Sequence, residues 1–272
     1  MENSLKIAFS TCPNDIFVFY AWTHNLLQKS PKLNTTYADI DITNKLITEK
    51  FFDILKISCA ALPKALENGY KLLPCGGALS NKGPLILTHK SNNEFKIKDI
   101  VGKTVAIPSL DSTAFKLFQL LLLENNITSN MYKLKVIPFQ NILLKLQQKE
   151  VDMGLVIHEA RFIYKLYDLK MLKDLGKWWF TKTNLPLPLG VIVAKKEHNT
   201  KLLKHCIQES YKYALKNKEE VYNYALTLAQ EKNIEIIKKH IKLYTNKFTF
   251  NIGRKGKKAI KTFLKESNKL RK

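Results

Sequence analysis

His158 is the residue best suited to acid–base chemistry. It ends the apolar run MGLVIH at residues 153–158 and is followed directly by Glu159. An imidazole with an ordinary pKa near ~6.5 is mostly unprotonated at neutral pH and can take a proton from carbon or oxygen. Because adjacent strand residues point to opposite faces, we expect Glu159 to cap the following turn rather than to orient the ring. The alternative is a structural histidine whose ring hydrogen-bonds a neighbouring carbonyl.

Two cationic side chains stand out from the many scattered lysines. Arginine is rare in this chain, and Arg161 either grips a substrate carboxylate or pairs with Glu159 or Asp168. Lys56 lies in the apolar stretch DILKIS, where a charge is costly unless it is paired or exposed at an edge. Lys56 and Ser58 are two residues apart, so both point to the same face of the expected strand.

The start of an expected helix at residues 112–126 is suited to an anion. Ser112, Thr113 and Ala114 open this helix directly after an apolar strand. Unpaired amides and the positive end of the helix dipole favour a carboxylate or phosphate there. Ordinary N-capping by Asp111 or Ser112 is the competing interpretation, and it is compatible with ligand binding.

These residues need a scaffold, and the apolar pattern predicts an α/β one. Short apolar runs alternate with helical patterns, as in βαβ units. The expected helix at 112–126 has apolar residues at i, i+3, i+4 and i+7, and after residue 200 the pattern is helical throughout. Strands are expected at residues 5–10, 53–58, 70–75, 84–89, 103–108, 134–138, 153–158 and 189–194.

Small or polar residues follow the carboxyl ends of many of these strands. Ligands of parallel α/β sheets bind outside those ends, where loops and helix N-termini converge. Turn chemistry alone accounts for part of the pattern. The residues concerned are Ser10, Thr11, Ser58, Gly76, Gly77, Ser109, Ser112, Thr113, His158 and Glu159.

The chain is expected to form two lobes. The polar loop and new strand at residues 91–107 suggest that the chain leaves one sheet and starts another. The two prolines and strong strand at 181–196 suggest that it returns. We therefore predict a discontinuous lobe 1 of residues 1–90 and 191–272, a lobe 2 of residues 91–190, and a ligand cleft between them.

Composition excludes several other classes of protein. Hydrophobic residues make up 45% of the 272 residues, enough for sizeable cores. The net charge of +22 comes mainly from lysines spread over every segment, which is typical of a solvated surface and does not predict a nucleic-acid partner. No apolar run reaches the ~18 residues of a membrane span and no signal peptide is evident, so we expect a cytoplasmic protein without a membrane partner.

Cofactor and metal motifs are missing from the sequence. The stretch GGALSNKGPL at 76–85 has neither the P-loop spacing nor the dinucleotide-binding glycine pattern. The four cysteines are far apart, without metal-ligand spacing or a disulfide pattern. We expect no cofactor and no metal.

Several specific sequence blocks resemble the 1,4-dihydroxy-6-naphthoate synthase family of the futalosine route to menaquinone. The blocks lie in order along residues 5–194, and the CPND, IHE-x-RF and LPLPLG parts are the specific ones. Beside CPND, Thr11 and Ile16 differ from residues common in the family. The matching blocks are FSTCPNDIFVFYA, LKISCAAL, GGALSNKGPL, PSLDSTAFKL, GLVIHEARF and DLGKWWFTKTNLPLPLG.

The resemblance implies a fold, a reaction and a set of site residues. The implied fold is that of type II periplasmic binding proteins, two α/β lobes around a cleft. The implied reaction is a lyase step from cyclic dehypoxanthinyl futalosine to 1,4-dihydroxy-6-naphthoate, with neither metal nor organic cofactor. His158 matches the family's general base, and Lys56, Ile57, Ser58, Thr113 and Ala114 match its substrate-binding segments. Further candidates are Ser10, Asn14, Gly77, Ser112 and Arg161.

Two other functions are compatible with the same sequence. One is chorismate dehydration in the same pathway, and the other is non-catalytic binding of a small anion on the same fold. In each case the expected partner is a small anionic molecule, and both a monomer and a homodimer remain open.

Overall fold

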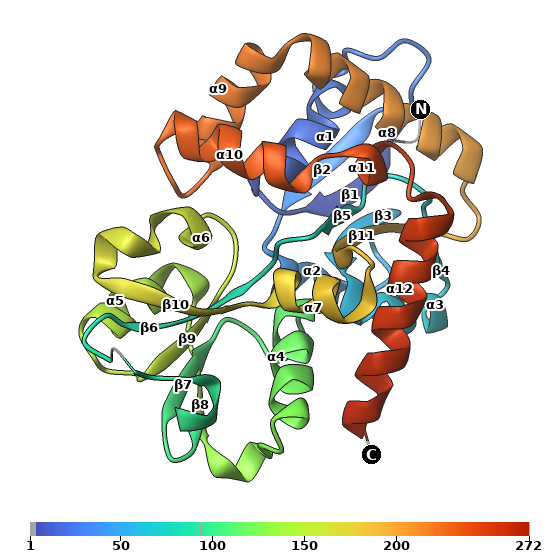
Figure 1. Ribbon diagram of the computed structural model, residues 1–272. Helices are drawn as coiled ribbons and strands as arrows, with labels where there is room; N and C mark the ends of the chain where they lie inside the picture. The colour runs from blue at the N-terminus through green and yellow to red at the C-terminus, as the bar shows by residue number, and fades with distance from the viewer. Residues whose placement is uncertain (1–3, 93, 272) are drawn as a thin grey trace. The chain divides into compact units, whose positions relative to one another are not determined.

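The structure is a computed structural model, which describes residues 4–92 and 94–271. It is an α/β protein with two β-sheets, and the chain divides into two compact units (Figure 1). Unit 1 comprises Met1–Leu79 and Pro188–Ile260, and unit 2 comprises Ser80–Leu187 and Lys261–Lys272.

This division differs from the predicted lobe boundaries at three places, of which the return at Pro188 instead of residue 191 is the smallest. The chain enters unit 2 earlier than residue 91, because β6 (Leu85–His89) pairs with two strands of the unit 2 sheet. The last residues also belong to unit 2, where Phe263 packs on Trp179 with ring centroids 5.9 Å apart.

The sheet of unit 1 has the order β2-β1-β3-β11-β4, with β5 paired to β11. β1 is parallel to β2 and β3, whereas β11 is antiparallel to β3 and β4. β3 therefore lies inside the sheet, and all its residues are buried. The strands are β1 (Leu5–Phe9), β2 (Leu33–Tyr37), β3 (Ile54–Ser58), β4 (Tyr70–Leu72), β5 (Ala78–Ser80) and β11 (Leu187–Lys195).

Helix α1 is the buried centre of unit 1. Its residues from Pro13 to Trp22 are all buried, because α8, α9 and α10 cover it (Figure 1). Pro13 starts the helix with a preset φ and no amide to satisfy. The helices here are α1 (Pro13–Thr23), α2 (Ile40–Leu46), α3 (Leu62–Glu67), α8 (Thr200–Lys216), α9 (Lys218–Leu228), α10 (Ile234–Tyr244), α11 (Lys247–Phe250) and α12 (Gly253–Ser267), whose last turns fall in unit 2.

The sheet of unit 2 has the order β10-β6-β9-β7-β8. β7 is parallel to β8 and β9, so the carboxyl ends of these three strands share one edge. The remaining pairs are antiparallel. The elements are β6, β7 (Thr104–Ile107), α4 (Thr113–Glu124), β8 (Lys133–Val136), α5 (Ile142–Gln147), β9 (Met153–Val156), α6 (Ala160–Ile163), β10 (Leu169–Asp174) and α7 (Leu175–Thr183).

Each predicted strand overlaps a strand of the structure, and three strands were missed. β2 (LNTTY) and β10 (LKMLKD) are edge strands rich in polar residues, so they lack an apolar run. β5 has only three residues. The expected helix at 112–126 is α4, and the region after residue 200 is helical as predicted.

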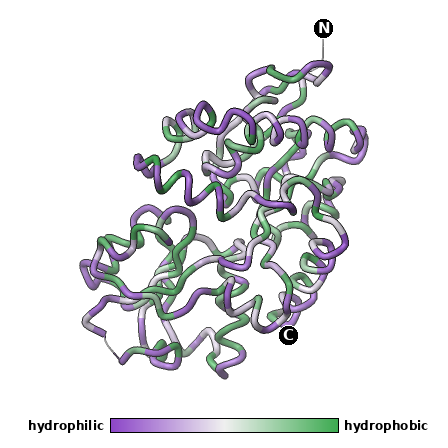
Figure 2. Tube along the Cα trace, turned by 45° about the horizontal axis from the view of Figure 1, so that its top comes forward, coloured by the Kyte–Doolittle hydropathy of each residue, from purple (hydrophilic) through white to green (hydrophobic). Residues whose placement is uncertain are grey.

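Hydrophilic residues are spread along the whole trace (Figure 2), in keeping with the scattered lysines. Within residues 4–92 and 94–271, no helix combines the length and the apolar character that a membrane crossing requires.

Candidate active site

A buried carboxylate in unit 1 brings together three of the predicted site residues. Asp15 lies in the first turn of α1 and is 3% exposed. Its Oδ2 accepts a hydrogen bond from Ser10 Oγ at 2.8 Å, and its Oδ1 accepts one from Asn14 Nδ2 at 2.7 Å. Lys56 Nζ lies 3.0 Å from the same Oδ1 and donates to the Gly76 carbonyl at 2.7 Å. Asp15 was missed in the sequence, although the buried Lys56 required an anionic partner.

The strand register explains why these residues meet. β1 and β3 run parallel, with Ala8 opposite Leu55, so the residues that follow β1 and the end of β3 share one edge. Lys56 is nearly fully buried on the inner strand β3, and its charge is tolerated because Asp15 neutralises it. Gly190 on β11 leaves space for the lysine, since a Cβ there would lie 3.2 Å from Lys56 Cε.

The other unit 1 candidates lie beside this network. Ser58 is buried, and its Oγ accepts a hydrogen bond from Asn44 Nδ2 at 3.1 Å while its amide donates to Asn44 Oδ1 at 3.0 Å. Ile57 points to the opposite face and is fully buried, so its contribution to a ligand site would come from its backbone. The carbonyl of Gly77 accepts a hydrogen bond from Thr249 Oγ1 at 3.2 Å.

In unit 2, Ser112 is the N-cap of α4. Its Oγ accepts a hydrogen bond from the Phe115 amide at 3.1 Å and donates to the Ser109 carbonyl at 3.2 Å. Thr113 and Ala114 follow in the first turn and are 3% and 4% exposed. The predicted N-capping is therefore present, and the first turn keeps the amide orientation that suits an anion.

His158 does not end a strand, contrary to the sequence prediction. β9 ends at Val156, and His158 lies in the turn before α6 with φ +55°. A non-glycine residue in the left-handed region carries strain, and such residues cluster at functional sites. The turn aims the half-buried imidazole at Phe139, with ring centroids 4.6 Å apart. Phe139 follows β8, so His158, Phe139 and the start of α4 share the carboxyl edge of β8, β7 and β9.

Arg161 pairs with neither Glu159 nor Asp168, the two acids predicted for it, but with Asp174. Its Nη2 forms an ion pair with Asp174 Oδ2 at 2.6 Å, and its Nη1 donates to the Gly83 carbonyl. Asp174 Oδ1 also accepts hydrogen bonds from the amides of Gly176 and Lys177, which caps α7. Arg161 thereby ties α6 to the start of α7, whereas Asp168 pairs with Lys90.

The cysteines are free thiols of different accessibility. Burial raises the pKa of the Cys75 thiol to about 12 and that of Cys206 to about 11, while Cys12 is partly exposed. We expect Ellman's reagent to modify Cys12 first in the native protein, because thiolates are the reactive form. A Cys12→Ser variant should remove this fast reaction, and fast native labelling of Cys75 would contradict the prediction.

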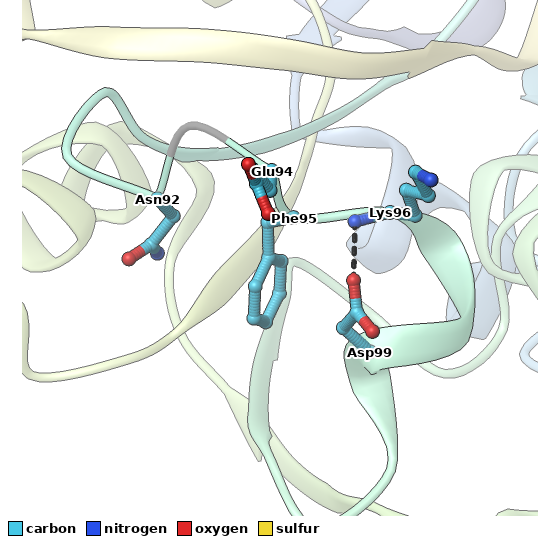
Figure 3. Close-up of a pocket in the computed structure, with 5 residues that line it drawn as sticks. All are labelled: Asn92, Glu94, Phe95, Lys96 and Asp99. Atoms are coloured by element: carbon cyan, nitrogen blue, oxygen red, sulfur yellow. Dashed lines mark hydrogen bonds between the residues drawn. The ribbon is translucent and has the colours of Figure 1, made fainter.

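A separate hollow lies on the surface of unit 2 and holds none of the predicted site residues. It is lined by Asn92, Glu94, Phe95, Lys96 and Asp99 (Figure 3). The Lys96 amide donates to Asp99 Oδ2 at 2.6 Å, which begins a short 3-10 helix. We assign this hollow a structural role in the turn.

Comparison with solved structures identifies the class of fold. The chain matches a structure from Archaeoglobus fulgidus with TM-score 0.87 and 25% identity, covering 98% of this chain and 97% of that one. It also matches the periplasmic aliphatic sulphonate binding protein of Escherichia coli with TM-score 0.71 and 13% identity, covering 98% and 88%. The fold is therefore of the periplasmic-binding-protein type, as predicted.

The sequence comparisons then identify the family. The model of the family described as Menaquinone biosynthesis matches residues 5–269. The chain is 40% identical to the 1,4-dihydroxy-6-naphthoate synthase of Streptomyces coelicolor, over 96% of this chain and 92% of that one. Its identity to the same enzyme of Thermus thermophilus is 33%, over 97% and 94%. The chain belongs to the 1,4-dihydroxy-6-naphthoate synthase family of menaquinone biosynthesis, which confirms the resemblance seen in its sequence blocks.

Proposed function

We propose that the chain is a carbon–carbon lyase that converts cyclic dehypoxanthinyl futalosine to 1,4-dihydroxy-6-naphthoate, with His158 as the general base. The observation that carries this proposal is the sequence similarity to two synthases of that name, which are 40% and 33% identical to the chain over nearly its full length. The strained turn at His158 supports the assignment of the base, because this turn presents an imidazole at the carboxyl edge of the unit 2 sheet.

The proposed reaction begins with proton transfer from the substrate to the imidazole of His158. The electron pair left on the substrate drives cleavage of a carbon–carbon bond, which gives the aromatic naphthoate and releases the rest of the substrate as a second product. Aromatisation favours the products, so the protein mainly positions the substrate and supplies the base. The proposed substrate-binding residues are Lys56, Ile57 and Ser58 of unit 1 and Thr113 and Ala114 of unit 2.

The direct test is incubation with cyclic dehypoxanthinyl futalosine, followed by mass detection of the naphthoate. The assay contains EDTA and no added cofactor, because the proposed chemistry needs neither a metal nor an organic group. Chorismate in a parallel reaction tests the dehydratase alternative. Turnover of chorismate alone would replace the proposed function, and binding without turnover of either compound would favour an anion-binding protein.

A Thr113→Val variant should bind substrate more weakly by roughly 1–2 kcal/mol, because it keeps the shape and removes a hydroxyl at a buried polar position. KM measured beside the unfolding midpoint separates binding from folding. The matched control is Thr183→Val in the same unit, where the hydroxyl has backbone partners of its own: the Trp179 and Leu185 carbonyls and the Leu185 amide. An unchanged KM for Thr113→Val would remove Thr113 from the site.

A further inference from the structure

The ion pair between Asp15 and Lys56 is an expensive feature of unit 1. The two side chains are 5% and 3% exposed, so both charges have lost their hydration. Removing an ion from water costs several kcal/mol, and replacing a buried ion pair with apolar residues is often neutral or stabilising. Stability of the fold therefore does not explain why this pair lies beneath the carboxyl edge of the unit 1 sheet.

Hydrogen bonds from neighbouring residues fix the orientation of the Asp15 carboxylate independently of its ion pair with Lys56. Ser10 donates to one oxygen and Asn14 to the other, so the plane of the Asp15 carboxylate is set from both sides. Asp15 is also held by its own amide, which donates to the Cys12 carbonyl at 2.9 Å. A carboxylate fixed in this way can hold a flexible lysine side chain in one rotamer.

The ammonium of Lys56 is then left with one donor for a ligand. Lysine has three N–H donors. Across residues 4–92 and 94–271, the acceptors recorded for it are Asp15 Oδ1 and the Gly76 carbonyl. Because Asp15 neutralises the charge, the remaining N–H suits a neutral oxygen, such as a hydroxyl or a ketone, better than a carboxylate.

We infer that Asp15 is a positioning residue, which holds the Lys56 ammonium so that its remaining N–H binds a neutral oxygen of the substrate. Ser10 and Asn14 fix the carboxylate and do not themselves bind substrate. This inference rests on the proposed function, in which Lys56 is a substrate-binding residue.

The test is a double-mutant cycle of Asp15→Asn and Lys56→Met, measured with cyclic dehypoxanthinyl futalosine. Asp15→Asn keeps the shape and removes the charge, and we expect it to raise KM about 10-fold while kcat stays within about 3-fold, because His158 is untouched. If Asp15 acts through Lys56, the double variant has the KM of Lys56→Met alone rather than the product of the two effects. The double variant should also fold better than Asp15→Asn, because it leaves no uncompensated buried charge.

The control is Asp53→Asn in the same unit. Asp53 lies just before β3, accepts a hydrogen bond from the Lys6 amide and pairs with Lys195 at 3.3 Å. The Asp53→Asn variant should be less stable than the wild type and should have the wild-type KM. Should Asp15→Asn fail to fold, the double variant and Lys56→Met decide: equal KM values above that of the wild type support the inference.

Two results would overturn it in different ways. A wild-type protein that turns over substrate while Asp15→Asn keeps its KM, or multiplicative effects in the cycle, would leave Asp15 with a structural role only. A wild-type protein that does not turn over the futalosine compound would overturn the proposed function, and the role of Asp15 in that reaction with it.

Discussion

His158→Asn is expected to lower kcat by about 10²- to 10⁴-fold while the protein stays folded and still binds substrate. Asparagine is the appropriate replacement, because it tolerates the left-handed backbone found at φ +55° and keeps a hydrogen-bonding tip. It lacks a nitrogen that accepts a proton at neutral pH, so it removes the base without disturbing the turn. Single-turnover measurements separate the chemical step from substrate binding and product release.

The matched control is His89→Asn at the end of β6 in the same unit. Its imidazole Nδ1 lies 2.8 Å from Ser91 Oγ, in a turn away from the residues assigned to the site. This variant should keep the wild-type kcat. A His158→Asn protein that turns over near the wild-type rate would show that the base lies elsewhere.

The pH profile offers an independent check on the same residue. Protonation of His158 removes the free base, so the wild-type rate should fall as the pH drops through the range where an imidazole takes up a proton, near ~6.5 for an ordinary histidine. The residual activity of His158→Asn should lack this acid limb. If the rates of both proteins fall in the same way at acid pH, the group that titrates is not His158.

The strand pattern of this fold can be read from the sequence because inner strands are apolar on both faces. Lys56 shows the limit of that prediction, because the sequence left open whether its charge is paired or exposed at an edge. Which carboxylate supplies the partner depends on a parallel register between β1 and β3, which joins residues 15 and 56. Local sequence carries no signal for that pairing.

His158 and Arg161, which follow β9, show a second limit of prediction from sequence. The apolar run predicts an extended chain as far as His158, yet the strand ends at Val156 and the backbone turns left-handed. Histidine is enriched in the left-handed region, but the apolar residues before it favour an extended chain, so the local pattern does not locate the turn. Arg161 was considered with acids nearby in sequence, whereas its partner Asp174 is at the end of the missed edge strand β10.

Breaking the ion pair between Arg161 and Asp174 should have the largest effect on stability. Asp174→Ala should destabilise unit 2 by about 3–5 kcal/mol, because it leaves the Arg161 charge nearly buried without its partner. It also removes the acceptor for the amides of Gly83, Gly176 and Lys177. Urea unfolding followed by tryptophan fluorescence reports on this region, since two of the three tryptophans lie in α7 directly after Asp174.

Arg161→Met should cost less than Asp174→Ala, because the remaining carboxylate keeps its backbone N–H donors. The control is Asp168→Asn, which removes the charge of an exposed pair with Lys90, suits the left-handed backbone there and should cost less than about 1 kcal/mol. If Arg161 is structural, kcat and KM of the folded Arg161→Met protein stay near the wild-type values. A large rise in KM with unchanged stability would instead make Arg161 a substrate ligand, the other role that its rarity in the sequence suggested.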